Sequence, residues 1–388
     1  MISLSKKAAA VKPYYFFNLQ KKIDQLKETG RTVLRLDIGS PDLPPPPEVL
    51  ATLAETVQAP GMHGYTPNRG PAAYREAVAR YYWKRFQTTL DPETEVLPLL
   101  GSKEGIINLH QVMIDPGDEV LIPNPGYPSY RFGTEHAGGV VREYTLSMAN
   151  QYLPDAAQIE SLLTPRTKVL WLNYPNNPTG ATIDIACMQT LVELARKHQF
   201  LIIHDAPYTE IYFDGSKPPS ILSVPGAKDV AVEINSLSKT FHMAGWRIGM
   251  VCGNAEVIQA LQVLKSKVDN STAAPIFAAA TKAFTLQRSW MDERNQIMKQ
   301  RRDCFLPYLK KYAPEYILPH GGFYIWAKIP AQFSTSAVFC DTALQETGVS
   351  ITPGYIYGSN GVDYYRISLC QPETVLRQAI KQLQDWLK

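Results

Sequence analysis

The chain has 388 residues, of which 45% are hydrophobic and 19% charged, and its 39 basic and 36 acidic residues leave a net charge of +3. This length is too great for one small core and favours a large domain with a smaller one. The charge gives no reason to expect nucleic acid or an anionic membrane as a partner. No apolar run approaches the length of a transmembrane helix.

Cysteine, histidine and the N-terminal residues exclude further classes. The five cysteines are scattered and odd in number, and none forms a Cys-x-x-Cys pair. A disulfide framework and a structural zinc site are therefore not expected. The seven histidines have no His-Glu-x-x-His spacing, so no catalytic metal is expected either. Lys12 and Pro13 break the first apolar stretch, which makes it a poor signal peptide, and we expect a cytoplasmic protein.

Short apolar segments alternate with helical segments over the first 285 residues. A strand at 33–39 precedes the proline cluster at 41–50, which we expect to be extended because each proline ring fixes φ. Helices are expected at 72–86, 101–114 and 184–199, and further strands at 95–100, 118–123, 140–146, 168–174, 200–205, 230–237 and 247–253. This alternation predicts an α/β fold whose mostly parallel sheet is covered by helices on both faces.

The pattern changes after about residue 285. A long polar helix at 288–312 precedes strands at 322–329 and 363–370 and a closing helix, an order that predicts a smaller α+β domain. We therefore divide the chain into three parts: an N-terminal segment (1–45) that packs with the small domain, a large domain (46–285) and a small C-terminal domain (286–388).

The segment SLSKTFHMAGWRIG at 236–249 carries the strongest chemical signal. It places Ser236, Lys239 and Arg247 close together between two apolar strands. An arginine beside a lysine favours loss of the lysine's proton, and a serine with an arginine suits a phosphate dianion. On this stretch alone, a solvated loop lysine is an equally good interpretation.

Further polar residues follow strands whose carboxyl ends should meet at one edge of the sheet, where open α/β sheets bind ligands. Ser102 and Lys103 open a helix after a glycine, and free N–H groups at a helix start suit a phosphate. The loop has neither the GxxxxGK[ST] nor the GxGxxG pattern, which disfavours nucleoside triphosphates and a nicotinamide oxidoreductase. Asp205 is the last residue of the strand at 200–205, and Tyr208 follows three residues later. Singly, each of these residues has an ordinary explanation as a helix cap or turn residue.

Together these residues fit pyridoxal 5′-phosphate (PLP). Its aldehyde and phosphate arm occupy adjacent ring carbons, so a lysine that forms a Schiff base must lie beside the phosphate ligands, as Lys239 does beside Ser236 and Arg247. The ring nitrogen and phenolic oxygen need partners from another strand, which Asp205 and Tyr208 can supply. An aspartate stabilises the protonated ring nitrogen and makes the ring a stronger electron sink.

Over nearly its full length the chain resembles the fold-type I, PLP-dependent aminotransferases of class I/II, in the branch that includes LL-diaminopimelate, aspartate and alanine aminotransferases. The segments that carry the resemblance are DIGSPD, YTPNRG, GSKEG, PGYPSY, NNPTG, DAPY, SLSKTFHMAGWRIG and YYRISL. The resemblance implies a seven-stranded sheet and a homodimer with shared active sites. It also implies a transaminase that moves an amino group from an L-amino acid to a 2-oxo acid, with 2-oxoglutarate the expected acceptor, by a ping-pong mechanism through a Schiff base on Lys239.

The same resemblance implies the roles of the site residues. The catalytic residues are Lys239, which carries the Schiff base, Asp205, which binds the pyridinium, and Tyr208. Tyr127 stacks on the ring, and Tyr208 and Asn177 hydrogen-bond its phenolic oxygen. The phosphate is held by Ser102, Lys103 (both through backbone N–H), Ser236, Arg247 and the partner subunit's Tyr65. The substrate carboxylate is bound by Arg366, with Gly39 and Asn177 nearby.

The sequence leaves the substrate open. LL-diaminopimelate aminotransferases tend to carry an acidic residue where this chain has Asn68, and asparagine near the position of Lys267. These two departures count against diaminopimelate, because either one alters the groups available to recognise a distal amino group. The aromatic run Tyr14–Phe17 either closes over the substrate or packs against the core. Two alternatives to a general aminotransferase stay open: an enzyme specific for LL-diaminopimelate, and a PLP-dependent C–S lyase on the same fold, which would share every cofactor residue.

Overall fold

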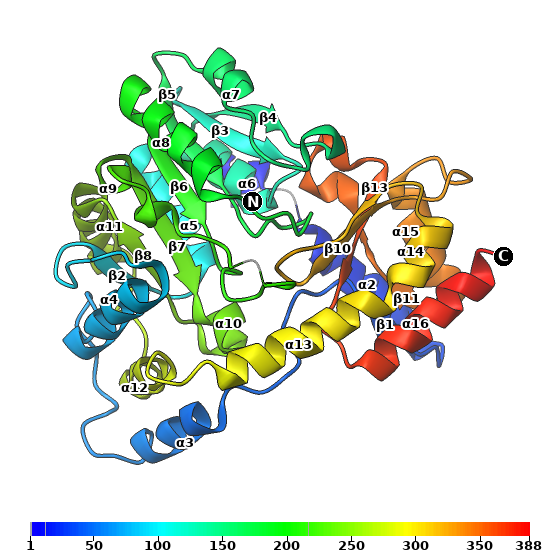
Figure 1. The fold of residues 1–388 in the computed structure, drawn as a ribbon, viewed down its shortest axis with the longest axis horizontal. Helices are drawn as coiled ribbons and strands as arrows, with labels where there is room; N and C mark the ends of the chain where they lie inside the picture. Colours follow the sequence, from blue (N-terminus) through cyan, green and yellow to red (C-terminus); the bar gives the residue numbers. More distant parts are fainter. Residues whose placement is uncertain (1, 12, 216) are drawn as a thin grey trace.

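The computed structural model describes residues 2–11, 13–215 and 217–388. Its main element is a seven-stranded sheet with the order β2-β8-β7-β6-β5-β3-β4 (Figure 1). The strands are β2 (Val96–Leu99), β3 (Glu119–Asn124), β4 (Val140–Thr145), β5 (Thr167–Leu172), β6 (Leu201–Asp205), β7 (Ala231–Ser236) and β8 (Gly249–Gly253). β8 runs antiparallel to β2 and β7, and the other neighbours pair in parallel. The predicted α/β fold with a mostly parallel sheet is confirmed.

Helices cover both faces of this sheet because its strands are apolar on both sides. Along β5, Leu170 and Leu172 belong to one buried cluster, whereas Val169 and Trp171 belong to another, as the alternation of side chains in a strand requires. The first cluster includes side chains of α4 (Ala72–Phe86), α8 (Ile185–His198) and α12 (Ala274–Ala283). The second includes side chains of α5 (Ser102–Met113), α6 (Pro128–Ala137) and α11 (Ala255–Val268). The strand ends are therefore held between two packed layers.

A second, antiparallel sheet with the order β12-β13-β10-β9 forms the core of the C-terminal part. Its strands are β9 (Tyr316–Ile317), β10 (Tyr324–Lys328), β12 (Thr352–Pro353) and β13 (Tyr364–Ser368). The neighbouring helices are α13 (Ser289–Cys304), α14 (Leu306–Tyr312), α15 (Ser336–Thr347) and α16 (Glu373–Trp386). The pairing of β10 with β13 places Trp326 opposite Arg366 and so sets the position of the predicted carboxylate-binding arginine.

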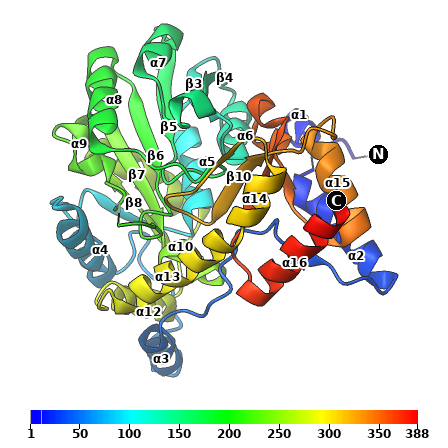
Figure 2. The ribbon, with the colours of Figure 1, turned by 45° about the vertical axis from the view of Figure 1, so that its right-hand side comes forward.

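The N-terminal residues lie against this C-terminal part. They form α1 (Lys6–Ala10), α2 (Tyr15–Glu28) and β1 (Leu34–Arg35), and β1 pairs in parallel with β11 (Val349–Ser350). Leu19 and Ile23 of α2 pack with Leu344 of α15, and Figure 2 shows the two helices on the same side of the molecule. The domain boundaries at 45 and 285 stay a prediction.

The remaining elements are short. The helices are α3 (Pro47–Thr56), α7 (Ala156–Leu162), α9 (Ala227–Val230) and α10 (Leu237–Thr240), and the 3-10 helices are η1 (Met148–Asn150), η2 (Ile221–Ser223), η3 (Ala244–Trp246), η4 (Gly354–Tyr357) and η5 (Ser359–Gly361). Among the described residues, no helix combines the length and apolar character needed to cross a membrane.

Two expectations about prolines were wrong. The helix predicted at 288–312 is divided at Phe305 into α13 and α14, because Pro307 cannot donate the hydrogen bond that would continue the first helix and instead lies in the first turn of the second. The proline cluster predicted to be extended at 41–50 has no helix or strand only up to Pro46, with a bend at Leu43. Helix α3 begins at Pro47, since proline is well suited to the first position of a helix.

Buried arginines of α13 connect the two parts of the molecule. Arg294 donates a hydrogen bond to the carbonyl oxygen of Lys239 at 3.2 Å. About two turns later, Arg301 donates to both carboxylate oxygens of Asp42 at 2.7 and 2.8 Å. One helix thereby holds the lysine segment and the segment after β1 in a fixed relation.

Candidate active site

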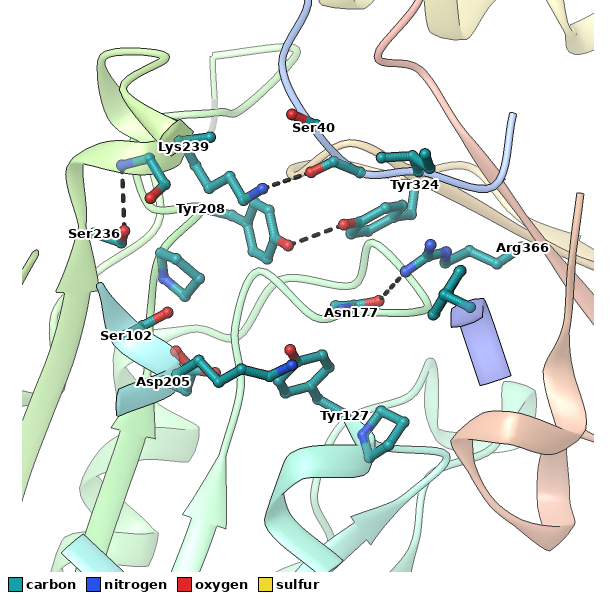
Figure 3. Close-up of a pocket in the computed structure, with 18 of the residues that line it drawn as sticks. Ser40, Ser102, Tyr127, Asn177, Asp205, Tyr208, Ser236, Lys239, Tyr324 and Arg366 are labelled. Atoms are coloured by element: carbon teal, nitrogen blue, oxygen red, sulfur yellow. Dashed lines mark hydrogen bonds between the residues drawn. The ribbon is translucent and has the colours of Figure 1, made fainter. Parts of the chain in front are cut away.

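A cavity of about 600 Å³ lies beyond the carboxyl ends of β5, β6 and β7. Its size is typical of small-molecule sites, which span roughly 300–1,000 Å³. Every site residue predicted from the sequence, except Tyr65, lines this cavity: Gly39, Ser102, Lys103, Tyr127, Asn177, Asp205, Tyr208, Ser236, Lys239, Arg247 and Arg366. In the view of Figure 3, Ser102 and Ser236 lie toward one end and Arg366 toward the other, with Lys239, Asp205 and Tyr208 between them.

Lys239 reaches the cavity from α10, which begins directly where β7 ends. Ser236, the last residue of β7, caps this helix, and its Oγ accepts a hydrogen bond from the backbone N–H of Ser238 at 3.2 Å. The Lys239 Nζ donates to the carbonyl oxygen of Gly39 (Figure 3). Because Arg294 also holds the backbone carbonyl of Lys239, both ends of this residue are anchored.

The start of α5 and the Arg247 guanidinium together form an anion-binding corner. The backbone N–H groups of Ser102 and Lys103 lie in the first turn, where no intrahelical acceptor is available. Gly101 precedes them with a φ of +80°, and a Cβ at this position would overlap the Arg247 side chain. Arg247 donates to the carbonyl oxygen of Leu100 at 3.3 Å. Glycine is thus needed here for both the backbone turn and the close approach of the guanidinium.

Asp205 is a buried carboxylate with one satisfied and one unsatisfied oxygen. Its Oδ2 accepts a hydrogen bond from the Tyr130 hydroxyl at 2.7 Å, whereas its buried Oδ1 has no partner in the described part of the chain. Burial raises the pKa of Asp205 to about 6, and the hydrogen bond from Tyr130 partly opposes this rise. Since an unpaired buried carboxylate oxygen is costly, the site calls for a donor with positive charge. The protonated ring nitrogen of PLP is such a donor, so this oxygen fits the cofactor.

Arg366 of β13 is the second buried charge of the cavity. It donates to Asn177 Oδ1 at 2.9 Å and to the carbonyl oxygen of Asp37 at 2.6 Å, and its guanidinium carbon lies 4.0 Å from the ring centroid of Tyr324. Its Nε has no partner among the described residues, and no ion pair involves Arg366 within them. A buried guanidinium whose partners are neutral is well suited to bind a ligand carboxylate in a bidentate manner.

Sequence reasoning missed several residues that line the cavity. Tyr324 donates to or accepts from the Tyr208 hydroxyl at 3.1 Å, and its hydroxyl occupies the space that a side chain at position 39 would need. Tyr357 lies 5.2 Å from the Arg366 guanidinium carbon. No local signal marks these tyrosines, because their position depends on how distant strands pair.

The N-terminal aromatic run fits both of its alternative interpretations. Tyr14 and Phe16 line the cavity, whereas Tyr15 and Phe16 also pack against the small cluster of α2. The structure places the remaining residues of interest outside the cavity: Tyr65 is 89% exposed, and Asn68 and Lys267 do not line it either.

Comparison with known proteins identifies the family. Residues 31–383 match the family described as aminotransferase class I and II. The chain belongs to this family. It is a PLP-dependent transaminase whose substrates are amino acids and 2-oxo acids, as the motifs predicted.

Individual relatives cover the whole chain. It is 41% identical over 387 residues to a protein named LL-diaminopimelate aminotransferase from Dehalococcoides mccartyi, and the match covers 100% of both sequences. A protein of the same name from Moorella thermoacetica is 40% identical, covering 96% of this chain and 95% of its own. Among solved structures, substrate-bound BacF from Bacillus subtilis is 36% identical with a TM-score of 0.95, covering 100% of this chain and 98% of that one. The aspartate aminotransferase of Thermus thermophilus with maleate is 30% identical with a TM-score of 0.93, covering 99% and 100%.

The burial of Asp205 predicts a pH-dependent cost to stability. In the folded chain its pKa of about 6 lies above the ordinary value of 3.8, so the native state binds the proton more tightly than the unfolded state. The cost is therefore fully present above pH 6 and disappears as the pH falls toward 4. We expect cofactor-free Asp205→Asn to be more stable than wild type by about 3 kcal/mol at pH 8 and equal to it near pH 4, as measured by urea unfolding. A stability difference that stays constant between these pH values would contradict this account.

Proposed function

We propose that the protein transfers the α-amino group of LL-diaminopimelate to 2-oxoglutarate. The observation that carries this proposal is the presence of two cations on the wall of one cavity. The Lys103 Nζ lies 4.7 Å from the ring centroid of Tyr14. Burial raises the pKa of Tyr14, and the positive charges of Lys103 and Arg366 oppose that rise, so both cations lie near the same ring. Arg366 is buried and Lys103 is exposed, which separates an inner from an outer carboxylate site.

A substrate with two carboxylates matches this pair of cations. LL-diaminopimelate, which gives the relatives from Dehalococcoides mccartyi and Moorella thermoacetica their name, carries two. So does 2-oxoglutarate. The maleate in the Thermus thermophilus structure is also a dicarboxylate, which supports the same substrate class. We assign Arg366, with Asn177 and the Gly39 backbone, to the α-carboxylate and the Lys103 ammonium to the distal one.

The remaining residues are assigned to the cofactor and to proton transfer. When bound, PLP supplies an aldehyde that combines with amino groups and a ring that withdraws electrons from the substrate α-carbon. Lys239 Nζ attaches the cofactor covalently and, as a free amine, is the base that moves the α-proton. Asp205 Oδ1 accepts the ring N–H. The phenolic oxygen is bound by Tyr208 and Asn177.

Contacts to the ring face and the phosphate complete the assignment. Tyr127 lies at the start of α6 and lines the cavity, so its ring is available to pack on the cofactor. The phosphate is assigned to the backbone N–H groups of Ser102 and Lys103, the hydroxyl of Ser236 and the Arg247 guanidinium. Donors from a helix start and a guanidinium are the groups that proteins use most often for phosphate dianions.

The covalent assignment predicts a single trapping site. Treatment of the PLP-loaded chain with sodium borohydride should fix the cofactor on Lys239, because reduction of the imine makes the bond permanent. Peptide mass analysis should find the added mass on this lysine alone, and Lys239→Ala should lose both the added mass and the visible absorption. Lys265→Arg is the matched control, since Lys265 is buried in ion pairs with Glu104 and Asp269 away from the cavity. Trapping on any other lysine would contradict the assignment.

The two-cation site predicts a selective loss of dicarboxylate substrates. Lys103→Met keeps the backbone N–H that is assigned to the phosphate and removes only the distal cation. We expect kcat/KM to fall about five- to tenfold for LL-diaminopimelate and L-glutamate and to stay unchanged for L-alanine. Lys103→Arg, which keeps the charge, should retain the preference.

The same donor panel tests the alternatives. It should include L-aspartate and L-phenylalanine with 2-oxoglutarate as acceptor, whereas L-glutamate needs a different 2-oxo acid, because its reaction with 2-oxoglutarate gives no net change. An equal loss on L-alanine in Lys103→Met would remove the side chain from distal recognition. Release of pyruvate from cystathionine without any 2-oxo acid would favour the C–S lyase instead.

We further propose a homodimer in which the partner's Tyr65 completes the phosphate site. Tyr65 is 89% exposed in the single chain, an unusual position for a tyrosine without a binding partner. Its neighbour Thr66 donates to the carbonyl oxygen of Thr272 at 2.8 Å, and the Thr272 hydroxyl donates to the carbonyl oxygen of Arg247 at 3.2 Å. The segment that presents Tyr65 is thus fastened to the backbone of the phosphate-binding arginine.

The dimer proposal predicts a defect from a change on the surface. Tyr65→Phe should weaken PLP binding about tenfold, because one hydrogen bond to a charged group is lost. Sedimentation should give a dimer mass for both the wild type and this variant. Tyr355→Phe serves as the control because Tyr355 is exposed. Tyr212→Phe is not a suitable comparison, since the Tyr212 hydroxyl accepts a hydrogen bond from Arg288. A monomer that binds PLP with full affinity would refute the shared site.

We also propose a cytoplasmic location. All five cysteines are free, and three of them, Cys252, Cys340 and Cys370, are buried as thiols in the packed core. Free thiols are typical of proteins that work in a reducing compartment.

A further inference from the structure

We propose that Tyr130 is a positioning residue that turns Asp205 toward the ring nitrogen of PLP. The proposal rests on the function assigned to Asp205 above and adds to it a residue that contacts neither cofactor nor substrate. Tyr130 does not line the cavity, and although it is the last residue of the segment PGYPSY, the resemblance assigned it no role.

The geometry around Asp205 shows how this works. The Tyr130 hydroxyl donates to Oδ2 at 2.7 Å, and it is the one side-chain donor that the described residues bring to this carboxylate. A carboxylate group can otherwise rotate about its bond to Cβ. The hydrogen bond from Tyr130 of α6 fixes Oδ2. The unpaired oxygen, Oδ1, is then the one that Asp205 presents to the cavity. The direction of the free lone pairs is therefore set before any cofactor binds.

Tyr130 is itself held by a stack of aromatic rings. Its ring lies parallel to that of Trp171, with centroids 4.7 Å apart and an angle of 14° between the planes. Trp171 Nε1 donates to His110 Nε2 at 3.1 Å, while His110 Nδ1 lies 2.7 Å from the carbonyl oxygen of Ile106. The carbonyl can only accept, so Nδ1 carries a proton, and Nε2 carries none because it accepts the indole N–H; His110 is therefore neutral. Burial, which lowers the pKa of His110 to about 4, keeps it so.

The neutrality of this stack matters for the cofactor. A cationic donor on Oδ2 would neutralise Asp205 and compete with the positively charged ring nitrogen. A phenol instead helps to keep the carboxylate ionised and leaves its charge for the cofactor. The arrangement thus provides orientation without charge compensation.

The test is Tyr130→Phe, which removes one oxygen and keeps the stacked ring. Tyr144→Phe is the matched control, because Tyr144 is also fully buried and its hydroxyl donates to a backbone carbonyl oxygen, that of Trp171 at 2.8 Å, and not to Asp205. The readout is the dissociation constant of two ligands for the cofactor-free full-length chain. These are PLP and its 1-deaza analogue, in which a C–H replaces the ring nitrogen.

We expect Tyr130→Phe to weaken PLP binding about tenfold and to leave binding of the 1-deaza analogue within twofold of wild type. Tyr144→Phe should leave both constants within twofold. An equal loss for the two ligands would mean that Tyr130 acts only on the shape of the site, and no loss for either would mean that it has no role; both results overturn the proposal. Failure of the wild type itself to bind PLP would instead refute the assigned cofactor function.

A double variant provides a second measurement that is independent of how Tyr130→Phe alone folds. Asp205→Asn removes the charge that Tyr130 is proposed to orient and, as derived above, stabilises the cofactor-free chain. In this background, Tyr130→Phe should change PLP affinity less than twofold. A further tenfold loss would show that the hydroxyl acts by another route and would also overturn the proposal.

Discussion

The structure depends on the parallel pairing of β6 with β7. This pairing places Asp205 opposite Ile234, two residues before Ser236 and the start of the lysine helix. Neighbouring strands lie about 4.8 Å apart, so backbone hydrogen bonds alone bring the buried carboxylate and the segment with Lys239 to one edge. A carboxylate without a cation is costly inside a protein, and the two packed layers that cover the sheet provide the stability to bear it. The chemistry of the site is thus a consequence of register.

The parts of the fold that could be predicted are those that depend on residues adjacent in the sequence, such as runs of apolar side chains. Apolar runs such as 168–174 and 200–205 are strands because their side chains are buried on both faces. The end of β6 was also predictable, since the strand stops at the charged residue Asp205. Proline was the main source of error in the predicted helices. Pro307 prevents α13 from continuing, whereas Pro47 begins α3. Its effect on a helix depends on position within the turn, which the residue type alone does not reveal.

The residues of the site also fall into a group that could be predicted from the sequence and a group that could not. Lys239 and its neighbours on one loop could be found because the residues that act together are adjacent in sequence. Tyr324 could not, because its approach to Gly39 requires β10 to pair with β13 and β13 to bind the N-terminal segment through the hydrogen bond from Ser368 N–H to the Leu36 carbonyl oxygen. Tyr130 is 75 residues from Asp205 and was read only as part of a matching segment. Contacts of this kind follow from how the layers stack, and a single sequence contains no periodicity that encodes them.

The overlap between position 39 and the Tyr324 hydroxyl has a consequence for how this enzyme can diversify. Any side chain at position 39 would displace Tyr324 and so break its hydrogen bond with Tyr208. The inner half of the cavity therefore tolerates few substitutions. Tyr14 and Phe16 stand at the beginning of α2, where Tyr14 is 46% exposed and both side chains line the outer wall of the cavity. We therefore expect a change of amino donor to be accommodated more easily at the N-terminal wall than in the inner half of the cavity.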